Sequence, residues 1–356
     1  MKQNALNEVM TKMNCNDCRN VWLKKPEFAT QVNGIFFTAI ITIAVLCTTI
    51  KQVHSKCPVA ATIKPCSCYD SGDSRSLSCY SSNITDVKGL FQNISKALDE
   101  KDRQFDSLSL SLQSVAELPA QAFADIKFKK ISISGSKVLK HIDVDLLKGN
   151  SDSVIEFSAS SLNLTDNLDI CNLVNSLEHL ETLTLSRNNL NVMPENAFKE
   201  HKNLTTVKIT SEQNLKISGN AFKSLGSSLR YMEIASANIT AISDNAFAFD
   251  DTLKENLRLI LNTDNIDLNG ISKSAFAGAK RPISLVLIKD KTILYLDEAV
   301  FSTFMKGNPL NEVMTQIDCT NCKNVWLKKP EFATQVNGIF CTNGLELNDP
   351  KNFVGC

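Results

Sequence analysis

The chain is poor in the residues that mark several other protein classes. Among 356 residues there are 13 glycines, 9 prolines, 2 tryptophans and 4 histidines. So little glycine and proline excludes collagen-like and low-complexity chains, and a hydrophobic share of 43% excludes disorder throughout. Lysine plus arginine and aspartate plus glutamate both number 38, so the formal net charge is zero. Without an excess of positive charge, we expect no nucleic-acid partner.

Signature motifs of common enzyme classes are also missing. The sequence contains no G-x-S-x-G nucleophile elbow, no phosphate-binding P-loop, no G-x-G-x-x-G and no H-E-x-x-H. We therefore expect no catalytic residues, no cofactor and no bound metal, and we interpret the protein as non-enzymatic.

Twelve cysteines are present, and they crowd towards the two ends of the chain. One cluster comprises Cys57, Cys66, Cys68 and Cys79, and the other comprises Cys319, Cys322, Cys341 and Cys356. A Cys-x-x-Cys pair can also bind zinc or carry out redox chemistry, but four-cysteine zinc sites usually show two close pairs, and fourteen residues separate Cys341 from Cys356, so disulfides are favoured. Cys171 stands alone and is interpreted as a small buried hydrophobic residue, with a reactive thiol or intermolecular bridge as the alternatives.

An apolar run without charge extends from Ile35 to Ile50. Its 16 residues fall short of the ~20 that span a membrane as a helix. Lysines precede the run and small residues follow it, which favours a signal peptide over residues 35–55. A single-pass membrane anchor and a buried core segment are the alternatives. Removal of this segment predicts a secreted, extracellular protein.

The N-terminus repeats part of the C-terminus. Residues 4–36 match residues 308–340 at 26 of 33 positions, with a constant offset of 304. The N-terminal copy stops before a counterpart of Cys341, so it cannot close the same cross-links by itself. We interpret residues 1–34 as a truncated duplicate that is unstructured or spurious.

The middle of the chain is periodic. An Ala-Phe pair ends at Phe123, Phe198, Phe222, Phe247 and Phe276, and Val300-Phe301 closes the series. Fifteen residues before three of these rings, a short alternation of apolar and polar residues begins at Leu183, Val207 and Met232. Such alternation predicts a strand in each unit. The stretch 153–179 is degenerate, and the unit at 257–276 carries extra residues.

A period of 24–25 residues with this pattern resembles the leucine-rich repeat. The resemblance implies an α/β repeat fold, a solenoid with a parallel β-sheet on its concave face. About eight repeats fit residues 84–303, with cysteine-rich caps at 57–83 and 304–356. The cap families pair the first cysteine with the third and the second with the fourth. Carried over, this implies the pairs Cys57–Cys68, Cys66–Cys79, Cys319–Cys341 and Cys322–Cys356. Asn188 stands at the asparagine position of the repeat, where Asn238 and Asn265 fit loosely.

The polar strand positions form the predicted binding face. They are mostly small, and the candidates for partner contact on the concave face are Thr184, Lys208, Glu233 and Arg258. Of these, only Arg258 belongs to the residue types that dominate interfaces, which are Trp, Tyr and Arg. Five N-x-[ST] sequons predict glycosylation in an exported chain; they begin at Asn83, Asn93, Asn163, Asn203 and Asn238.

The Ala-Phe repeats and the C-terminal block DCTNCKNVWL…GIFCTNGLELND…FVGC are similar to one group in particular. They resemble secreted arthropod leucine-rich-repeat proteins typified by the non-catalytic subunit of Oplophorus-luciferin 2-monooxygenase. This resemblance implies a binding or scaffold protein with a protein partner. The alternatives are a membrane-anchored recognition receptor, which requires that residues 35–50 stay uncleaved, and a non-catalytic partner of a separate catalytic subunit.

Overall fold

The computed structural model describes residues 57–135, 138–165, 167–226, 228–249, 254–266, 270–288 and 293–356. The chain divides into two compact units, residues 1–56 and 57–356, and every described residue belongs to the second. The predictions for residues 1–34 and 35–55 therefore fall outside the described residues.

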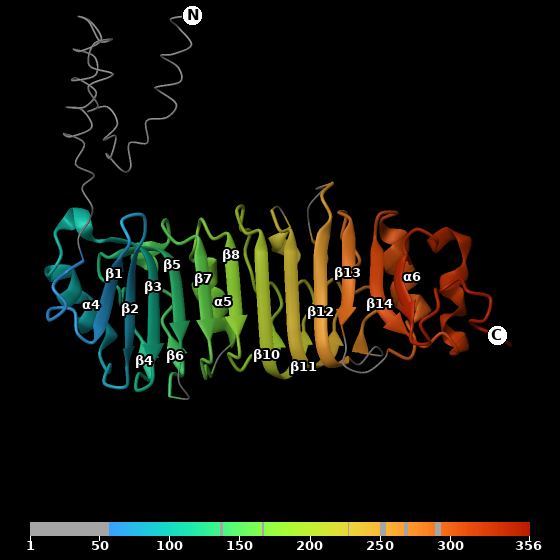
Figure 1. Ribbon diagram of the computed structural model, residues 1–356, viewed down its shortest axis with the longest axis horizontal. Coiled ribbons are helices and arrows are strands. Elements are labelled where there is room, and N and C mark those ends of the chain that lie inside the picture. Colours follow the sequence, from blue (N-terminus) through green and yellow to red (C-terminus); the bar gives the residue numbers. More distant parts are fainter. Residues whose placement is uncertain are drawn as a thin grey trace, which may run out of the picture. The chain divides into compact units, whose positions relative to one another are not determined.

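One sheet runs through the second unit. Its strands lie side by side in chain order, from the blue end to the red end of Figure 1. β1 and β2 pair antiparallel, and the neighbouring pairs that follow along the sheet are parallel. The strands, in spatial order, are β1 (Cys66–Asp70), β2 (Arg75–Ser81), β3 (Gln104–Leu112), β5 (Lys127–Ser134), β7 (Glu156–Ser160), β8 (Thr182–Ser186), β10 (Thr206–Ile217), β11 (Tyr231–Ile242), β12 (Leu257–Ile266), β13 (Ile283–Ile288), β14 (Glu312–Ile317) and β15 (Gly338–Cys341).

Short elements connect the strands. The α-helices are α4 (Val87–Lys96), α5 (Asn167–Asn175) and α6 (Glu298–Gly307). The 3-10 helices are η2 (Glu100–Asp102), η3 (Lys148–Asn150), η4 (Lys223–Leu225), η6 (Cys322–Lys328) and η7 (Pro330–Phe332). The remaining strands are two-residue pieces: β4 (Glu117–Leu118) pairs with β6 (His141–Ile142), and β9 (Val192–Met193) pairs with β10. The degenerate stretch 153–179 therefore still supplies a strand, β7, and a helix, α5.

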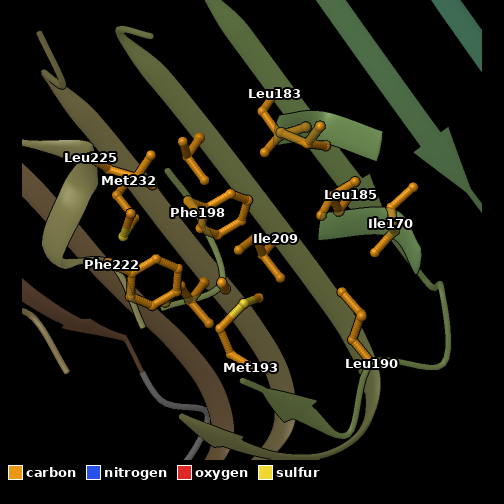
Figure 2. Close-up of a cluster of buried hydrophobic side chains, with 14 of the residues drawn as sticks. Ile170, Leu183, Leu185, Leu190, Met193, Phe198, Ile209, Phe222, Leu225 and Met232 are labelled. Atoms are coloured by element: carbon orange, nitrogen blue, oxygen red, sulfur yellow. The ribbon is translucent and has the colours of Figure 1, made fainter. Parts of the chain in front are cut away.

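The core is built from every second residue of each strand. Leu183 and Leu185 of β8 align with Val207 and Ile209 of β10, and all four side chains are fully buried. Figure 2 shows this cluster, with Phe198 and Phe222 packed beside the strand residues. Burying one such aliphatic side chain stabilises the fold by about 1.5–3 kcal/mol. A single strand and turn cannot bury its own apolar side, so each repeat depends on its neighbours.

A ladder of phenylalanine rings runs beside these rows. Phe198 and Phe222 stack with ring centroids 6.0 Å apart, Phe222 and Phe247 at 5.5 Å, and Phe247 and Phe276 at 5.4 Å. The prediction that Phe301 continues the series needs a correction. The ring that contacts Phe276 is Phe304, at 4.9 Å, while Phe301 is buried elsewhere on α6. In this last unit a helix replaces the turn, and Phe301 and Phe304, three residues apart on it, are both buried.

The residue before three of the Ala-Phe pairs helps to explain why the motif recurs. Asn196, Asn220 and Asn245 adopt left-handed backbone conformations, with φ of 50°, 54° and 55°. Asparagine tolerates this conformation better than other residues that have a side-chain β-carbon. The turn then directs the following alanine and phenylalanine into the core, where both are buried. The repeated Asn-Ala-Phe is therefore a local turn signal as well as a packing signal.

Buried asparagines join repeats, at Asn188 as the sequence suggests and at three positions that the sequence did not single out. The Asn188 side chain accepts a hydrogen bond from Leu162 N at 3.1 Å and donates to Ala159 O at 2.8 Å. Asn238 and Asn265 align with each other near the ends of β11 and β12. The side chains that share the two-way bonding of Asn188 are Asn150, Asn311 and Asn324. Each satisfies backbone groups of the preceding repeat, which would otherwise be buried without partners.

Disulfides hold both ends of the repeat stack. The structure contains Cys57–Cys68, Cys66–Cys79, Cys319–Cys341 and Cys322–Cys356, which are the pairs that the cap resemblance implies. Each such bridge typically contributes about 2–4 kcal/mol, mainly by restricting the unfolded chain. Cys171 lies on α5 and is buried, in agreement with its interpretation as a small core residue.

Candidate binding face

The sheet has one face towards the core, and the opposite face is called here the open face. It carries the side chains that alternate with the buried rows. Because the neighbouring strands along the sheet from β2 onwards are parallel, and their register is regular up to Ser211 of β10, these side chains form straight rows across the sheet. The row that contains Thr184 of β8 continues through Lys208 of β10 and Glu233 of β11. Three of the four predicted contact residues therefore lie side by side.

The N-terminal part of the open face is a field of hydroxyl groups. None of these serine and threonine side chains is buried, and their field is interrupted by the ion pair of Lys130 with Glu156 at 2.8 Å and by the exposed ring of Tyr80, the register partner of Ser111. The hydroxyl-bearing residues are Ser76, Ser78, Ser107, Ser109, Ser111, Ser132, Ser134, Ser158, Ser160, Thr182, Thr184, Ser186, Thr206 and Thr210. Small hydroxyl side chains offer hydrogen bonds but little contact area, so this zone is a weak candidate for tight binding.

The centre of the open face has a different chemistry. Tyr231 donates a hydrogen bond from its hydroxyl to Glu233 Oε2 at 2.8 Å. Lys208 Nζ lies 5.7 Å from the centroid of the Tyr231 ring, within the range of a cation–π contact. Arg258 is exposed on the next strand, where it is the register partner of Tyr231. These four residues, Lys208, Tyr231, Glu233 and Arg258, are called the central cluster.

Electrostatics within the central cluster act on the tyrosine. Partial burial, the hydrogen bond to Glu233 and the negative charge of Glu233 raise the pKa of Tyr231. The positive charge of Arg258 opposes this rise. The phenol is therefore neutral around pH 7 and acts as a hydrogen-bond donor attached to an apolar ring. Such a side chain offers a partner both apolar contact area and a directional hydrogen bond.

The register corrects the predicted position of Arg258. The spacing of the earlier units, 24 and 25 residues, places Arg258 in the row of Lys208 and Glu233. In the structure Glu233 aligns with Ile260, and Arg258 aligns with Tyr231. The extra residues of this unit lengthen the connection between β11 and β12, which shifts the strand by two positions. A shift of two keeps Arg258 on the open face but moves it one row away.

Tyr231 itself was missed by the sequence analysis, which found no tyrosine on this face. The signal was available, because Tyr231 precedes Met232 as Thr182 precedes Leu183 and Thr206 precedes Val207. In the sequence, the polar residue between the two buried residues of each strand is easy to recognise as part of the open face. The row just before them is also on the open face, since side chains alternate along the whole strand.

The C-terminal part of the open face mixes apolar and polar side chains. Ile260, Val286 and Met314 form one row across β12, β13 and β14, in which Ile260 and Val286 are buried and Met314 is half-buried. Ile288 and Phe340 are exposed in the neighbouring row, at 45% and 61%. Met314 lies over Gly338, because a β-carbon placed at Gly338 would stand 2.6 Å from Met314 Cγ. The open face thus changes from hydroxyl groups, through the central cluster, to a part that includes exposed hydrocarbon.

No metal or redox centre accompanies this face within the part of the chain that the structure describes. Among those residues, no group of three or more histidine, cysteine, aspartate or glutamate side chains is arranged to hold a metal ion. The cysteines of the Cys319-x-x-Cys322 pair are each bonded to a more distant cysteine, Cys341 and Cys356. Neither is available as a thiolate ligand or as half of a vicinal redox pair.

The sequons lie away from the rows of the central cluster. Asn83, Asn93, Asn163 and Asn203 are exposed in connections or on α4. Asn238 differs, since it lies within β11, is half-buried, and donates a hydrogen bond to Asn214 Oδ1 at 2.7 Å. None of the described helices is both long enough and apolar enough to cross a membrane. The apolar run Ile35–Ile50 is outside the described residues.

Comparison with known proteins identifies the repeats. The family model described as the BspA type Leucine rich repeat region matches in six copies, over residues 117–254 and 172–305. No curated protein matches the chain. The resemblance to the arthropod subunit therefore stays a prediction, whereas the repeat type itself is established.

Proposed function

Because the chain belongs to the BspA-type leucine-rich-repeat family, we propose that it is a secreted, non-enzymatic binding or scaffold protein. In this proposal the repeats form a solenoid with the sheet on its concave face, and the open face over β10, β11 and β12 holds a protein partner. Leucine-rich repeats generally serve as protein-interaction scaffolds, and the curved sheet of a solenoid is the usual contact surface.

The observation that carries the proposal is the central cluster. Tyrosine and arginine are among the residues that contribute most to protein interfaces, and here Tyr231 and Arg258 are register partners. Lys208 adds a second cation, and its ammonium group lies above the same ring. A partner that covers the ring and meets the two cations would gain both apolar contact and charge-assisted hydrogen bonds.

The surroundings of the central cluster support the same position for the bound partner. Ile288 and Phe340 of the C-terminal strands are 45% and 61% exposed, so a partner that extends from the cluster towards β13 and β15 can also cover hydrocarbon. The exposed sequons lie outside the rows of the central cluster, and glycans attached there would leave the cluster accessible. Asn238 is the one sequon on β11, and it lies beyond the in-register rows of the cluster.

Secretion is supported by the disulfides and by the sequons. Disulfide pairs at both ends of the repeats are typical of proteins that fold in an oxidising compartment. Binding rather than catalysis is supported by the chemistry of the cluster. A tyrosine with a raised pKa is a poorer acid or base near neutral pH than an ordinary tyrosine, and it is well suited to be a stable hydrogen-bond donor.

The test compares matched baits. The full chain is produced in a secreting eukaryotic host, and wild-type protein, Tyr231→Ala with Arg258→Glu, and Ser132→Ala are immobilised separately. Proteins captured from extracellular fluid are quantified by mass spectrometry. We expect a partner that the wild type and Ser132→Ala retain equally and the double variant loses by about tenfold or more, since hot-spot truncation typically costs 2 kcal/mol or more. Equal capture by all three baits would place binding elsewhere, and the identity of the captured chain shows whether it is an enzyme.

A further inference from the structure

We propose that the first sugar of a glycan on Asn83 packs against the exposed ring of Tyr80 and so fixes the glycan at the N-terminal end of the open face. This inference rests on the secretion proposed above, because N-linked glycans are attached to exported chains. It goes beyond the sequon itself, since it gives the glycan a defined position and gives the ring a defined occupant.

The ring of Tyr80 is a flat apolar surface without a cover. Tyr80 is the last residue of β2 on the open face, and its side chain is 62% exposed. Its register partner on β3 is Ser111, whose side chain is too short to shield the ring. Within the part of the chain that the structure describes, no hydrogen bond or ring contact joins the Tyr80 side chain to another group. The ring is therefore available to a group attached nearby.

Asn83 follows Tyr80 by three residues and lies in a turn. Ile84 N donates to Ser81 O at 3.5 Å, and Asn83 N donates to Ser81 Oγ at 3.1 Å. A turn of this kind brings its ends together, so the backbone of Asn83 stays close to the end of β2. The Asn83 side chain is exposed, and it makes no hydrogen bond among the described residues. Its amide nitrogen can therefore carry a sugar without the loss of a contact.

The turn is held on both sides of Asn83. Ser114 Oγ, from the following repeat, donates to Ser82 O at 2.6 Å. Ile84, the middle residue of the sequon, is buried in the core. Because the backbone is fixed, a sugar attached to Asn83 has few orientations relative to Tyr80. Little conformational entropy is then lost when the sugar packs against the ring.

The chemistry of the sugar matches that of the ring. The first sugar of an N-linked glycan is N-acetylglucosamine, and the faces of its pyranose ring present C–H groups. The face of an aromatic ring is electron-rich and attracts these weakly positive groups, and the contact also removes apolar surface from water. The hydroxyl group of Ser111 adds a hydrogen-bonding group beside the ring. Since the sugar is tethered, its effective concentration at the ring is high.

The other sequons lack an aromatic residue at this spacing. The residues three positions before Asn93, Asn163, Asn203 and Asn238 are Leu90, Ser160, Glu200 and Ala235. The inference therefore concerns Asn83 specifically, rather than glycosylation of the chain in general.

Tyr69 provides a matched control within the same chain. It lies on β1 and is 68% exposed, about as much as Tyr80. Its register partner is Ser76, so it faces the same side of the sheet but lies towards the opposite end of β2. The nearest sequon begins 14 residues later in the sequence, at Asn83. A sugar on Asn83 that contacts Tyr80 is expected to leave Tyr69 uncovered.

The experiment measures the accessibility of both rings in the full chain, secreted from a eukaryotic host as wild type and as Asn83→Gln. Mass spectrometry first establishes the occupancy of Asn83. Each folded protein is then iodinated briefly, and after removal of the glycans the tryptic peptides give the rates for Tyr80 and Tyr69, which Arg75 separates. We expect Tyr80 to react about fivefold more slowly in the glycosylated protein. Tyr69 should react equally in both proteins.

A second measurement separates a contact from general shielding. Protein with high-mannose glycans is trimmed by endoglycosidase H, which leaves one N-acetylglucosamine on Asn83. The slower reaction of Tyr80 should persist, because the first sugar makes the contact. In untrimmed protein, Tyr80→Ala should speed the release of the Asn83 glycan by peptide N-glycosidase F, whereas Tyr69→Ala should leave that rate as in the wild type.

The contrary outcomes are distinct. Equal reactivity of Tyr80 with and without the glycan overturns the contact, and so does loss of the protection when one sugar remains. An unmodified Asn83 in protein recovered from the medium also overturns it, but leaves secretion and the central cluster unaffected. A chain that is not exported would contradict the proposed function, and this inference with it.

Discussion

Tyr231 of β11 and Arg258 of β12 occupy matching positions on neighbouring strands. This pairing brings an aromatic ring and a guanidinium group together on the open face, 27 residues apart in sequence. Each also belongs to a wider set of contacts, since Tyr231 binds Glu233 and lies beneath Lys208. The central cluster is therefore one coupled unit, and a change at any member should be measurable at the tyrosine.

The ionisation of Tyr231 tests that coupling directly. Glu233→Gln is expected to lower the pKa of Tyr231 towards 10, because it removes a negative charge next to the phenol. Arg258→Ala is expected to raise it further, since the arginine favours the phenolate. The measurement is ultraviolet absorbance during alkaline titration, with Tyr231→Phe subtracted to isolate this residue among the four tyrosines. Shifts of the same sign in both variants would contradict the assigned geometry.

The buried His201 predicts a loss of stability in mild acid. Burial lowers its pKa from 6.5 to about 4, so the folded state resists protonation more than the unfolded state does. The stabilisation is complete above pH 6.5 and is lost as the pH falls from 6.5 towards 4, by up to about 3 kcal/mol. Urea unfolding at stepped pH measures it. His201→Gln should flatten the profile in this window, and His179→Gln, at an exposed histidine, should leave it as in the wild type.

The hydrogen bonds of Asn188 to the preceding repeat predict that removal of its side chain destabilises the folded protein. In Asn188→Ala, Leu162 N and Ala159 O lose their partners while they remain buried, so the free energy of unfolding should fall by about 2–4 kcal/mol. Chemical denaturation followed by circular dichroism measures the loss. Asn203→Ala removes an exposed asparagine and should change stability by less than about 0.5 kcal/mol. Similar values for the two variants would mean that Asn188 does not join the repeats.

The phenylalanine ladder predicts that the free energy of unfolding falls further the more of a buried phenylalanine side chain is removed. Phe222 stacks between Phe198 and Phe247 and is fully buried. Phe222→Ala should lower the free energy of unfolding by about 3–5 kcal/mol, because it leaves a cavity in the stack. Phe222→Leu fills part of that space and should cost less. Phe340→Ala removes an exposed ring and serves as the reference, for which thermal unfolding should show little change.

The position of Asn238 predicts that the sequons are glycosylated to different extents. Its amide nitrogen is bonded to Asn214 within the sheet, and the side chain is half-buried. A glycan at that nitrogen would disturb the contact, so we expect Asn238 to be largely unmodified in folded, secreted protein. Asn83, Asn93 and Asn203 are exposed and should carry glycans. Site-specific mass spectrometry of tryptic glycopeptides measures occupancy, and full occupancy at Asn238 would show that this segment opens or folds late.

Much of the architecture could be predicted because each repeat has the same pattern of buried and exposed residues. Alternation places Leu183 and Leu185 in the core, and the spacing to Phe198 recurs in the next units. The end of the series could not be predicted in the same way. There a helix replaces the turn, so Phe304 rather than Phe301 meets Phe276. Local pattern identifies apolar residues, but the choice between two rings on one helix depends on the packing around them.

The sequence by itself determined the repeat, its buried rows and the hydroxyl-rich half of the open face, because alternation and period require no knowledge of neighbouring strands. Only the tertiary structure decided which polar residues meet. The sequence placed Arg258 beside Glu233, but the longer connection between β11 and β12 moves the strand by two residues and pairs Arg258 with Tyr231. Which face a residue occupies follows from its place in its own strand. Its neighbours follow from strand register, which depends on the length and course of the connections between strands.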